Sequence, residues 1–337
     1  MKVVSLEGTH KLEVMQKDAP KPDGNLAVIQ IDKCGICGSE THFWYDIGDQ
    51  MKGTIMGHEY AGIVVDPGSN TKFKKGDRVV PIATCGCGKC YLCHEGNSNV
   101  CQSEPLYMGG YGEYTICNAD SMFKIPDGLS FLEACMTEPC ATGLHAVNYA
   151  NVKVGDTVCV IGAGIIGLSC AVFSKLAGAK RVALIDINMK KAQKALEWGD
   201  VDAIFDGSDE KLNEKLMEYN GGIGFDKIFE CSGAPACQAN TTKITKRKGK
   251  IVFVGAAPVD TPMPLSDALF GEMDLLSVYA YSWDDFEKTL EAIADGRLNV
   301  KNYGSKVITL DEVPQAFDDI VNRRVDDIKV IIDVSKK

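Results

Sequence analysis

The sequence predicts an α/β protein of two domains, the second of which is a doubly wound parallel sheet. Glycine and proline interrupt short alternating strands throughout the first 140 residues, and the pattern changes at Val152. From there, short apolar segments recur at roughly 20 to 25 residue spacing, with helix-period segments between them. A chain of 337 residues is long enough for two domains that each bury a core.

The first part of the chain predicts a mostly β domain with many loops. AVIQID at 27–32 alternates apolar and polar residues, as a half-buried strand does, and DPGSN at 66–70 is typical of a turn.

The second part predicts six strands joined by helices. Such strand–helix–strand units form parallel sheets, whose right-handed crossovers leave a ligand crevice at the carboxyl ends of the strands. The predicted strands are TVCVI (157–161), RVALID (181–186), DAIF (202–205), DKIFE (226–230), KIVFVG (250–255) and LLSVYAY (275–281).

The residues after Tyr281 predict two amphipathic helices, DDFEKTLEAIADGRL and LDEVPQAFDDIVNRR, and a final strand, KVIIDV. No periodicity in this tail indicates where it packs.

Composition excludes some partners and compartments. The net charge of −10 offers no basic surface for nucleic acid or for an anionic membrane. No segment approaches the roughly 18 apolar residues of a membrane span, and the N-terminal residues resemble no export or import signal. Fourteen cysteines without such a signal favour metal-bound thiolates in a reducing, cytoplasmic protein over a disulfide scaffold.

The segment GAGIIG follows the first predicted strand of the second part and opens an apolar helix. In this frame Gly162 forms the turn, Gly164 lets the backbone approach a pyrophosphate, and Gly167 permits close packing of helix and strand. Asp186 would accept hydrogen bonds from ribose hydroxyls and repel a 2′-phosphate, which favours NAD over NADP; two lysines just after it weaken that preference. A glycine-rich turn without a ligand is the alternative.

Four cysteines with the spacing CxxCxxCx7C predict a structural zinc site. Cys87, Cys90, Cys93 and Cys101 can surround one tetrahedral ion and leave no open position. Disulfide pairing is the alternative, which the close spacing and the reducing compartment disfavour.

A second metal site combines residues that are distant in sequence. Cys37 supplies a thiolate, MGHEYAG supplies His58 and Glu59, and MTEPCATGLHA supplies Glu138. One thiolate, one imidazole and one carboxylate leave a position free for water or an alcohol, as a catalytic zinc requires. Each of these residues alone could be ordinary loop or core chemistry, so the prediction depends on their occurring together.

Taken together, CGICGSETH, GHEYAG, the four-cysteine segment, TEPCATGLHA and VIGAGIIG resemble the zinc-containing medium-chain dehydrogenase/reductase superfamily, in its polyol and threonine dehydrogenase branch. The resemblance spans essentially the whole chain. It implies a GroES-like, β-rich catalytic domain of residues 1–140 and 280–337, with a Rossmann NAD-binding domain of residues 141–279 inserted. It also implies two zinc ions per chain and a homodimer or homotetramer.

The resemblance also implies roles for individual residues. Cys37, His58 and Glu138 would hold the catalytic zinc, with Glu59 either a ligand or one that exchanges with water. Glu40, where the family usually has aspartate, would orient the His58 ring. The residues implied to bind the cofactor are Gly162, Gly164, Ile165, Ile166, Gly167, Asp186, Thr142, Val254 and Gly255.

The implied reaction is the oxidation of a secondary alcohol with NAD, in which zinc lowers the pKa of the substrate hydroxyl. Ser39 and His42 would carry the released proton toward solvent, although His42 could be a surface histidine. Sorbitol dehydrogenases have polar residues where this chain has Phe43 and Ala280, which makes sorbitol itself a doubtful substrate.

We therefore expect a small hydroxylated substrate: a polyol, sugar derivative, cyclitol or amino alcohol. The alternatives are a threonine or butanediol dehydrogenase, a zinc-free quinone reductase, and a non-enzymatic NAD-binding structural or sensing protein. The last two would need none of the catalytic ligands.

Overall fold

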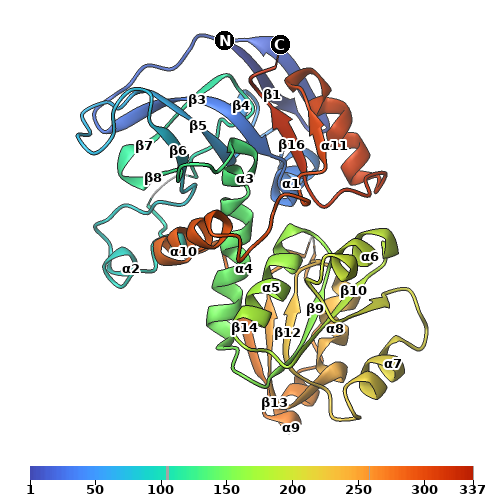
Figure 1. Ribbon diagram of the computed structural model, residues 1–337. Helices are drawn as coiled ribbons and strands as arrows, with labels where there is room; N and C mark the ends of the chain where they lie inside the picture. The colour runs from blue at the N-terminus through green and yellow to red at the C-terminus, as the bar shows by residue number, and fades with distance from the viewer. Residues whose placement is uncertain (104–105, 258, 337) are drawn as a thin grey trace. The chain divides into compact units, whose positions relative to one another are not determined.

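The computed structural model describes residues 1–103, 106–257 and 259–336 (Figure 1). The chain divides into two compact units, unit 1 formed by Met1–Pro139 with Ser282–Lys337, and unit 2 formed by Cys140–Tyr281. Unit 2 contains a parallel sheet and unit 1 contains mostly antiparallel sheets, which confirms the predicted fold class.

Unit 1 contains a small sheet and a large one. The small sheet has the order β2-β1-β4, and the large sheet has the order β15-β16-β3-β5-β6-β8, with β7 also paired to β3. Their strands are β1 (Lys2–Gly8), β2 (Lys11–Gln16), β3 (Leu26–Gly35), β4 (Thr54–Ile55), β5 (Glu59–Asp66), β6 (Arg78–Pro81), β7 (Tyr114–Asn118), β8 (Met122–Lys124), β15 (Lys306–Ile308) and β16 (Val330–Asp333).

Short helices connect these strands. They are α1 (Gly38–Asp46), α2 (Tyr91–His94), α3 (Phe131–Cys135), α10 (Trp283–Ala294) and α11 (Val313–Val321), with 3₁₀ turns η1 (Ser98–Val100), η2 (Ala119–Ser121) and η3 (Leu310–Glu312). The longer α4 (Thr137–Ala150) begins at the end of the N-terminal segment of unit 1.

Strand β3 is the centre of the large sheet. It is ten residues long and pairs antiparallel with β5, β7 and β16. The pairing with β16 joins the C-terminal tail to the sheet of the N-terminal segment, and both chain ends lie in this unit (Figure 1). Residues from the two ends of the sequence are thereby brought together in the middle of one sheet.

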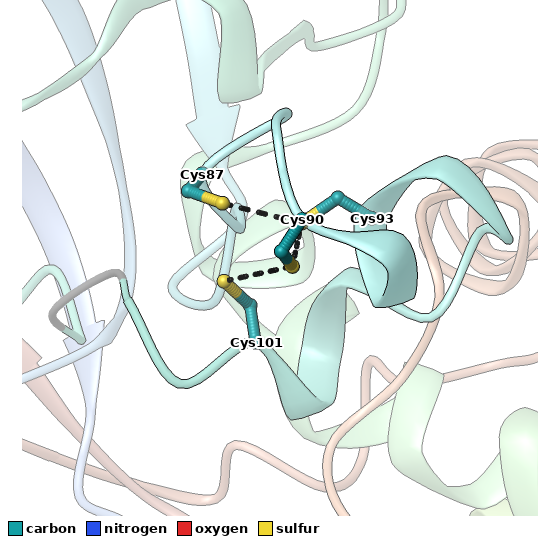
Figure 2. Close-up of side chains that lie close together, drawn as sticks. All are labelled: Cys87, Cys90, Cys93 and Cys101. Atoms are coloured by element: carbon teal, nitrogen blue, oxygen red, sulfur yellow. Dashed lines mark hydrogen bonds between the residues drawn. The ribbon is translucent and has the colours of Figure 1, made fainter.

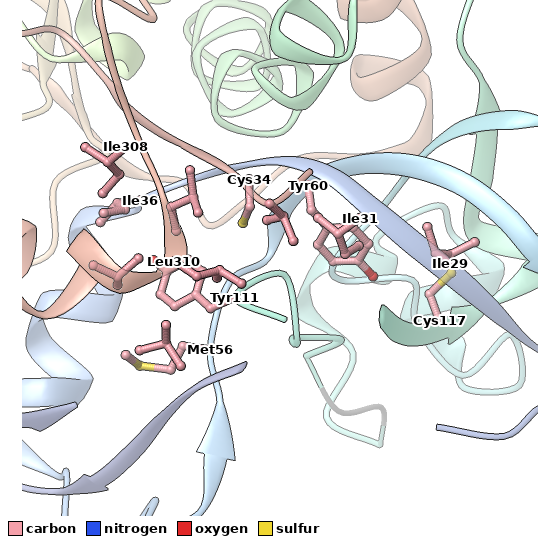
Figure 3. Close-up of a cluster of buried hydrophobic side chains, with 14 of the residues drawn as sticks. Ile29, Ile31, Cys34, Ile36, Met56, Tyr60, Tyr111, Cys117, Ile308 and Leu310 are labelled. Atoms are coloured by element: carbon pink, nitrogen blue, oxygen red, sulfur yellow. The ribbon is translucent and has the colours of Figure 1, made fainter. Parts of the chain in front are cut away.

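The core of unit 1 lies against this sheet. Its buried residues come from β3, from the loop before β5, and from the C-terminal segment, among them Ile29, Met56 and Leu310 (Figure 3). Two buried tyrosines, Tyr60 and Tyr111, belong to the same cluster. Burial of this apolar surface is the main force that holds the distant segments together.

Unit 2 is a six-stranded parallel sheet with the order β11-β10-β9-β12-β13-β14. Its strands are β9 (Thr157–Ile161), β10 (Arg181–Asp186), β11 (Ala203–Asp206), β12 (Phe225–Glu230), β13 (Thr245–Phe253) and β14 (Asp274–Ser277). The helices are α5 (Ile165–Leu176), α6 (Met189–Glu197), α7 (Leu212–Tyr219), α8 (Pro235–Ile244) and α9 (Leu265–Gly271). The order reverses between β9 and β12, where doubly wound sheets bind their ligands.

The predicted strands of unit 2 are all present. β9 and β10 have the predicted bounds, because runs that are buried on both faces of a parallel sheet are continuously apolar. The prediction for 275–281 was too long, since β14 ends at Ser277. Its neighbour β13 ends at Phe253, so the last register pair is Phe253 with Ser277. Ala280 then adopts a positive φ of 51° as the chain turns away.

Candidate active site

Three possible metal ligands meet at one end of the large sheet of unit 1. Cys37 is the N-cap residue of α1, His58 directly precedes β5, and Glu59 is the first residue of β5. The Cys37 sulfur, a ring nitrogen of His58 and a carboxylate oxygen of Glu59 all lie within 4.8 Å of one another. Ligands predicted from separate motifs therefore form a compact group.

Glu138, the predicted carboxylate ligand, lies beside this group. It stands in the first turn of α4 and is buried, but its oxygens are not among the donor atoms that cluster within 4.8 Å. Its charge nevertheless contributes to the raised pKa values of His58 and Lys329. Glu59 is the carboxylate that completes the compact group.

Glu40 contacts the His58 ring, as the resemblance implies. Its Oε1 lies 3.1 Å from His58 Nδ1 and accepts a hydrogen bond from Gly57 N at 2.7 Å. Although burial opposes protonation of His58, the negative charges of Glu40 and Cys37 raise the pKa of its imidazole well above the usual value. The same concentration of negative charge favours a divalent cation, which would take the place of a ring proton.

Lys329 is a functional neighbour that the motifs did not reveal. It is buried immediately before β16, and its Nζ lies 2.5 Å from both oxygens of Glu59. Only the contact with Oε1 has hydrogen-bond geometry, and Oε2 has no hydrogen-bond partner among the described residues. Burial opposes the charge on Lys329, yet Glu59 and Cys37 raise the pKa of the ammonium group.

Gly35 makes room for this ion pair. β3 lies between β5 and β16, and Gly35 is in register with Glu59 on one side and Ile331 on the other. A Cβ at Gly35 would lie 2.0 Å from Glu59 Oε2 and 2.8 Å from Lys329 Cε. The pair therefore crosses the central strand at a point where no side chain fits. The only sequence signal for Lys329 is a lone lysine that begins the apolar run of the last strand.

The donors of this group fit zinc. A thiolate, an imidazole and a carboxylate are the mixed ligands of catalytic zinc sites. The buried Glu59 Oε2 without a hydrogen-bond partner is a further oxygen that a cation could satisfy.

The predicted proton relay residues lie on α1. Ser39 Oγ donates a hydrogen bond to the Cys37 sulfur at 3.2 Å. His42 is three residues further along the same helix face, with its side chain 44% exposed and its Nδ1 3.6 Å from an Asp46 carboxylate oxygen. One residue thus touches the ligand group and the other reaches solvent.

The four predicted structural ligands are brought together at a separate place (Figure 2). The sulfur–sulfur distances are 3.6 Å for Cys90 to Cys93, 3.8 Å for Cys90 to Cys101, and 3.9 Å for Cys87 to Cys93. A tetrahedron with zinc–sulfur bonds of about 2.3 Å has edges of about 3.8 Å, whereas a disulfide bond measures about 2.05 Å. The spacing therefore fits one tetrahedral ion and no disulfide.

Backbone amides point at the sulfurs of this cluster. Lys89 N donates to Cys87 at 3.4 Å and Ser103 N donates to Cys101 at 3.5 Å. The Lys89 amide and then the Cys90 amide lower the pKa of Cys87 to about 6. Such contacts stabilise the thiolate form that a metal requires.

The predicted cofactor residues of unit 2 gather at the carboxyl ends of its strands. Gly164 is the N-cap of α5, so Ile165 and Ile166 form the first turn of that helix. A Cβ at Gly167 would lie 1.9 Å from Gly162 O, which explains why glycine is needed there. Val254 and Gly255 follow β13 at the same edge, whereas Thr142 lies on α4.

Asp186 ends β10 next to this loop. Its Oδ2 accepts a hydrogen bond from Ala163 N at 2.6 Å, and its Oδ1 accepts one from Asn188 N at 2.6 Å. The carboxylate is therefore held in a fixed orientation between the glycine-rich loop and the start of α6.

Within residues 1–103, 106–257 and 259–336, no helix is both long enough and apolar enough to span a membrane.

Comparison with known proteins agrees with this arrangement. The family model for an alcohol dehydrogenase GroES-like domain matches residues 23–127, and the model for a zinc-binding dehydrogenase matches residues 166–295. The chain is 31% identical to the uncharacterised zinc-type alcohol dehydrogenase-like protein YdjJ of Escherichia coli, over 99% of this chain and 98% of the relative. It is 28% identical to D-xylulose reductase A of Aspergillus oryzae, over 94% and 92% of the two chains.

A solved structure is similar over the same length. An oxidoreductase/dehydrogenase of unknown specificity from Escherichia coli aligns with a TM-score of 0.92 and 29% identity, covering 99% of each chain. The fold and the matches define a zinc-type oxidoreductase. The chain belongs to the zinc-containing medium-chain dehydrogenase superfamily, in its polyol dehydrogenase branch.

Proposed function

We propose that this protein oxidises a secondary alcohol of a polyol, sugar derivative, cyclitol or amino alcohol to a ketone, reversibly and with NAD. The observation that carries the proposal is the group formed by Cys37, His58 and Glu59, whose donor atoms lie within 4.8 Å of one another. When bound, zinc would polarise the substrate hydroxyl and NAD would accept the hydride.

In this proposal Cys37, His58 and Glu138 hold the catalytic zinc. Glu59 either joins them or remains with Lys329, whose Nζ lies 2.5 Å from its carboxylate. The buried positions of His58, Glu59 and Glu138 support a site that limits access of water. Ser39 and His42 pass the substrate proton to solvent, a role that the exposure of His42 supports.

A second, structural zinc is proposed at Cys87, Cys90, Cys93 and Cys101. The sulfur–sulfur distances of 3.6 to 3.9 Å support it, because they match the edges of one tetrahedral site.

We propose NAD as the coenzyme because the fixed carboxylate of Asp186 would accept ribose hydroxyls and repel a 2′-phosphate. Lys190 and Lys191 in the first turn of α6 reduce that discrimination.

We also propose a homodimer or homotetramer in the cytosol. Large apolar side chains exposed at α9, namely Leu265, Leu269 and Phe270, support association through the edge of the parallel sheet. The four-cysteine cluster, whose sulfur spacing fits one metal ion, supports a reducing compartment. Light scattering of wild type and Phe270→Ser would test the assembly, and an unchanged mass would exclude α9 from the interface.

The activity is tested by following reduced nicotinamide with a panel of xylitol, sorbitol, butanediol, threonine and inositol. Cys37→Ser should abolish turnover, whereas Cys34→Ala, a buried cysteine of β3, should retain it within a few-fold. Metal analysis should give about two zinc ions per wild-type chain. One zinc per chain and no turnover on any alcohol would instead favour a non-enzymatic NAD-binding protein.

A further inference from the structure

Glu40 is held by four hydrogen bonds, one of which comes from a tyrosine that no motif includes. Oε1 accepts from Gly57 N and contacts His58 Nδ1, and Oε2 accepts from Cys37 N at 3.0 Å and from the Tyr111 hydroxyl. A carboxylate offers about four lone-pair sites. With all of them used, the carboxylate of this fully buried side chain has one orientation.

Tyr111 is itself fixed to the segment that carries His58. Tyr111 N donates to Met56 O at 2.9 Å, and the preceding Gly110 N donates to Gly57 O at 2.8 Å. Its ring is buried in the core of unit 1 (Figure 3). It meets the Phe317 ring edge-on, with centroids 6.0 Å apart. The hydroxyl therefore approaches Glu40 from a rigid backbone.

We propose that Tyr111 is a positioning residue for the catalytic zinc, which it serves by fixing the Glu40 carboxylate that orients the His58 ring. This inference rests on the proposed zinc function of Cys37 and His58. Tyr111 does not touch substrate or metal. It acts through Glu40, and Glu40 acts through Nδ1 of His58, which leaves Nε2 to face the ligand group.

The length of the Glu40 side chain explains why its carboxylate needs the hydrogen bond from Tyr111. The glutamate side chain has several rotatable bonds, so its carboxylate keeps one orientation only where hydrogen bonds hold both oxygens. Cys37 N and Gly57 N each hold one oxygen, and among the described residues the Tyr111 hydroxyl is the only side-chain donor to Glu40 other than the His58 ring. Without it, Oε2 would keep only the Cys37 amide and the carboxylate could rotate away from His58.

The test is Tyr111→Phe, which removes one oxygen and keeps the ring. We expect the catalytic zinc to leave about 10 to 100-fold faster to a chelator, since loss of a group that supports a metal ligand weakens binding by that factor. The four-cysteine zinc should leave at the wild-type rate. With cobalt at the catalytic site, the absorption bands should shift, because the orientation of the imidazole changes.

The matched control is Tyr60→Phe. Tyr60 is a buried tyrosine of the same core whose hydroxyl interacts with the Cys117 thiol and not with Glu40. This variant should keep wild-type zinc release and a wild-type cobalt spectrum. Equal acceleration in both variants would mean that general loosening of the core, not Tyr111, is responsible.

Glu40→Asp provides an independent test in case Tyr111→Phe fails to fold. The substitution shortens the side chain, so that its carboxylate can no longer reach Tyr111 and His58 together, and this variant should also release the catalytic zinc faster. Adding Tyr111→Phe to Glu40→Asp should then have little further effect, because the two residues act as one unit. Wild-type zinc release and spectra in Tyr111→Phe, or fully additive effects in the double variant, would overturn the inference. A wild-type protein that holds only one zinc would instead overturn the proposed function.

Discussion

Lys329→Met should destabilise unit 1 because it leaves the Glu59 carboxylate buried without a cation. Both side chains are nearly inaccessible, at 6% and 1% exposure, and Lys329 Nζ is 2.5 Å from each carboxylate oxygen. Removal of one partner from a buried ion pair costs about 3–5 kcal/mol.

Methionine is similar in length to lysine, so the expected loss of about 3–5 kcal/mol at pH 7 comes from the unpaired charge and not from a cavity.

The measurement is urea unfolding followed by tryptophan fluorescence. Trp44 and Trp283 belong to unit 1 and Trp198 belongs to unit 2, so a Trp198→Phe background restricts the signal to unit 1. Zinc content is measured on each sample to keep the metal state equal.

Two further variants sharpen the result. Lys2→Met breaks the exposed pair with Asp311, which is 60% exposed, and should cost less than about 1 kcal/mol. Glu59→Gln combined with Lys329→Met should recover most of the stability at pH 7, since no buried charge remains. A double variant that is no more stable than Lys329→Met would refute the electrostatic explanation.

Three other predictions concern separate features. Gly35→Ala should destabilise unit 1 by about 1–3 kcal/mol in the same urea assay, because its Cβ would lie 2.0 Å from Glu59 Oε2; an unchanged midpoint would contradict this close approach. Asp186→Ser should weaken NAD binding by about 10 to 100-fold in a titration of nicotinamide fluorescence while affecting NADP less, and equal losses for both would exclude the ribose contact. Asp226→Asn should destabilise unit 2 at neutral pH. Burial opposes ionisation of Asp226, but Lys246 and Thr157 outweigh it and lower its pKa, so this contribution is present above about pH 4 and is lost as pH falls further. A stability difference that does not shrink as pH falls below about 4 in acid-unfolding curves would contradict that assignment.

The strands of unit 2 could be predicted from the local sequence. The bounds of β9 and β10 follow from short apolar runs, and Gly167 follows from the contact that its missing side chain permits. Each of these features depends on residues close in the chain. The end of β14 depends instead on where β13 ends, which no pattern within 275–281 reveals.

The candidate site likewise contains residues that local motifs reveal and residues that they do not. Cys37 and His58 lie in recognisable motifs, and the structure brings their donor atoms together. Lys329 reaches Glu59 from 270 residues away, and Tyr111 reaches Glu40 from 71 residues away. Neither pairing leaves a local pattern, because strand register and backbone pairing set it, not the spacing of residue types.

The central position of β3 explains why these distant contacts converge on the ligand group. β3 delivers Gly35 and then Cys37, its neighbour β5 delivers Glu59, and its other neighbour β16 is preceded by Lys329. A one-residue slip of either neighbour would move every side chain to the opposite face of the sheet. The register of the sheet therefore decides whether Cys37, Glu59 and Lys329 meet at all. Changes in the pairing of β16 with β3, far from the cysteine and histidine motifs, should alter zinc retention before they alter the fold.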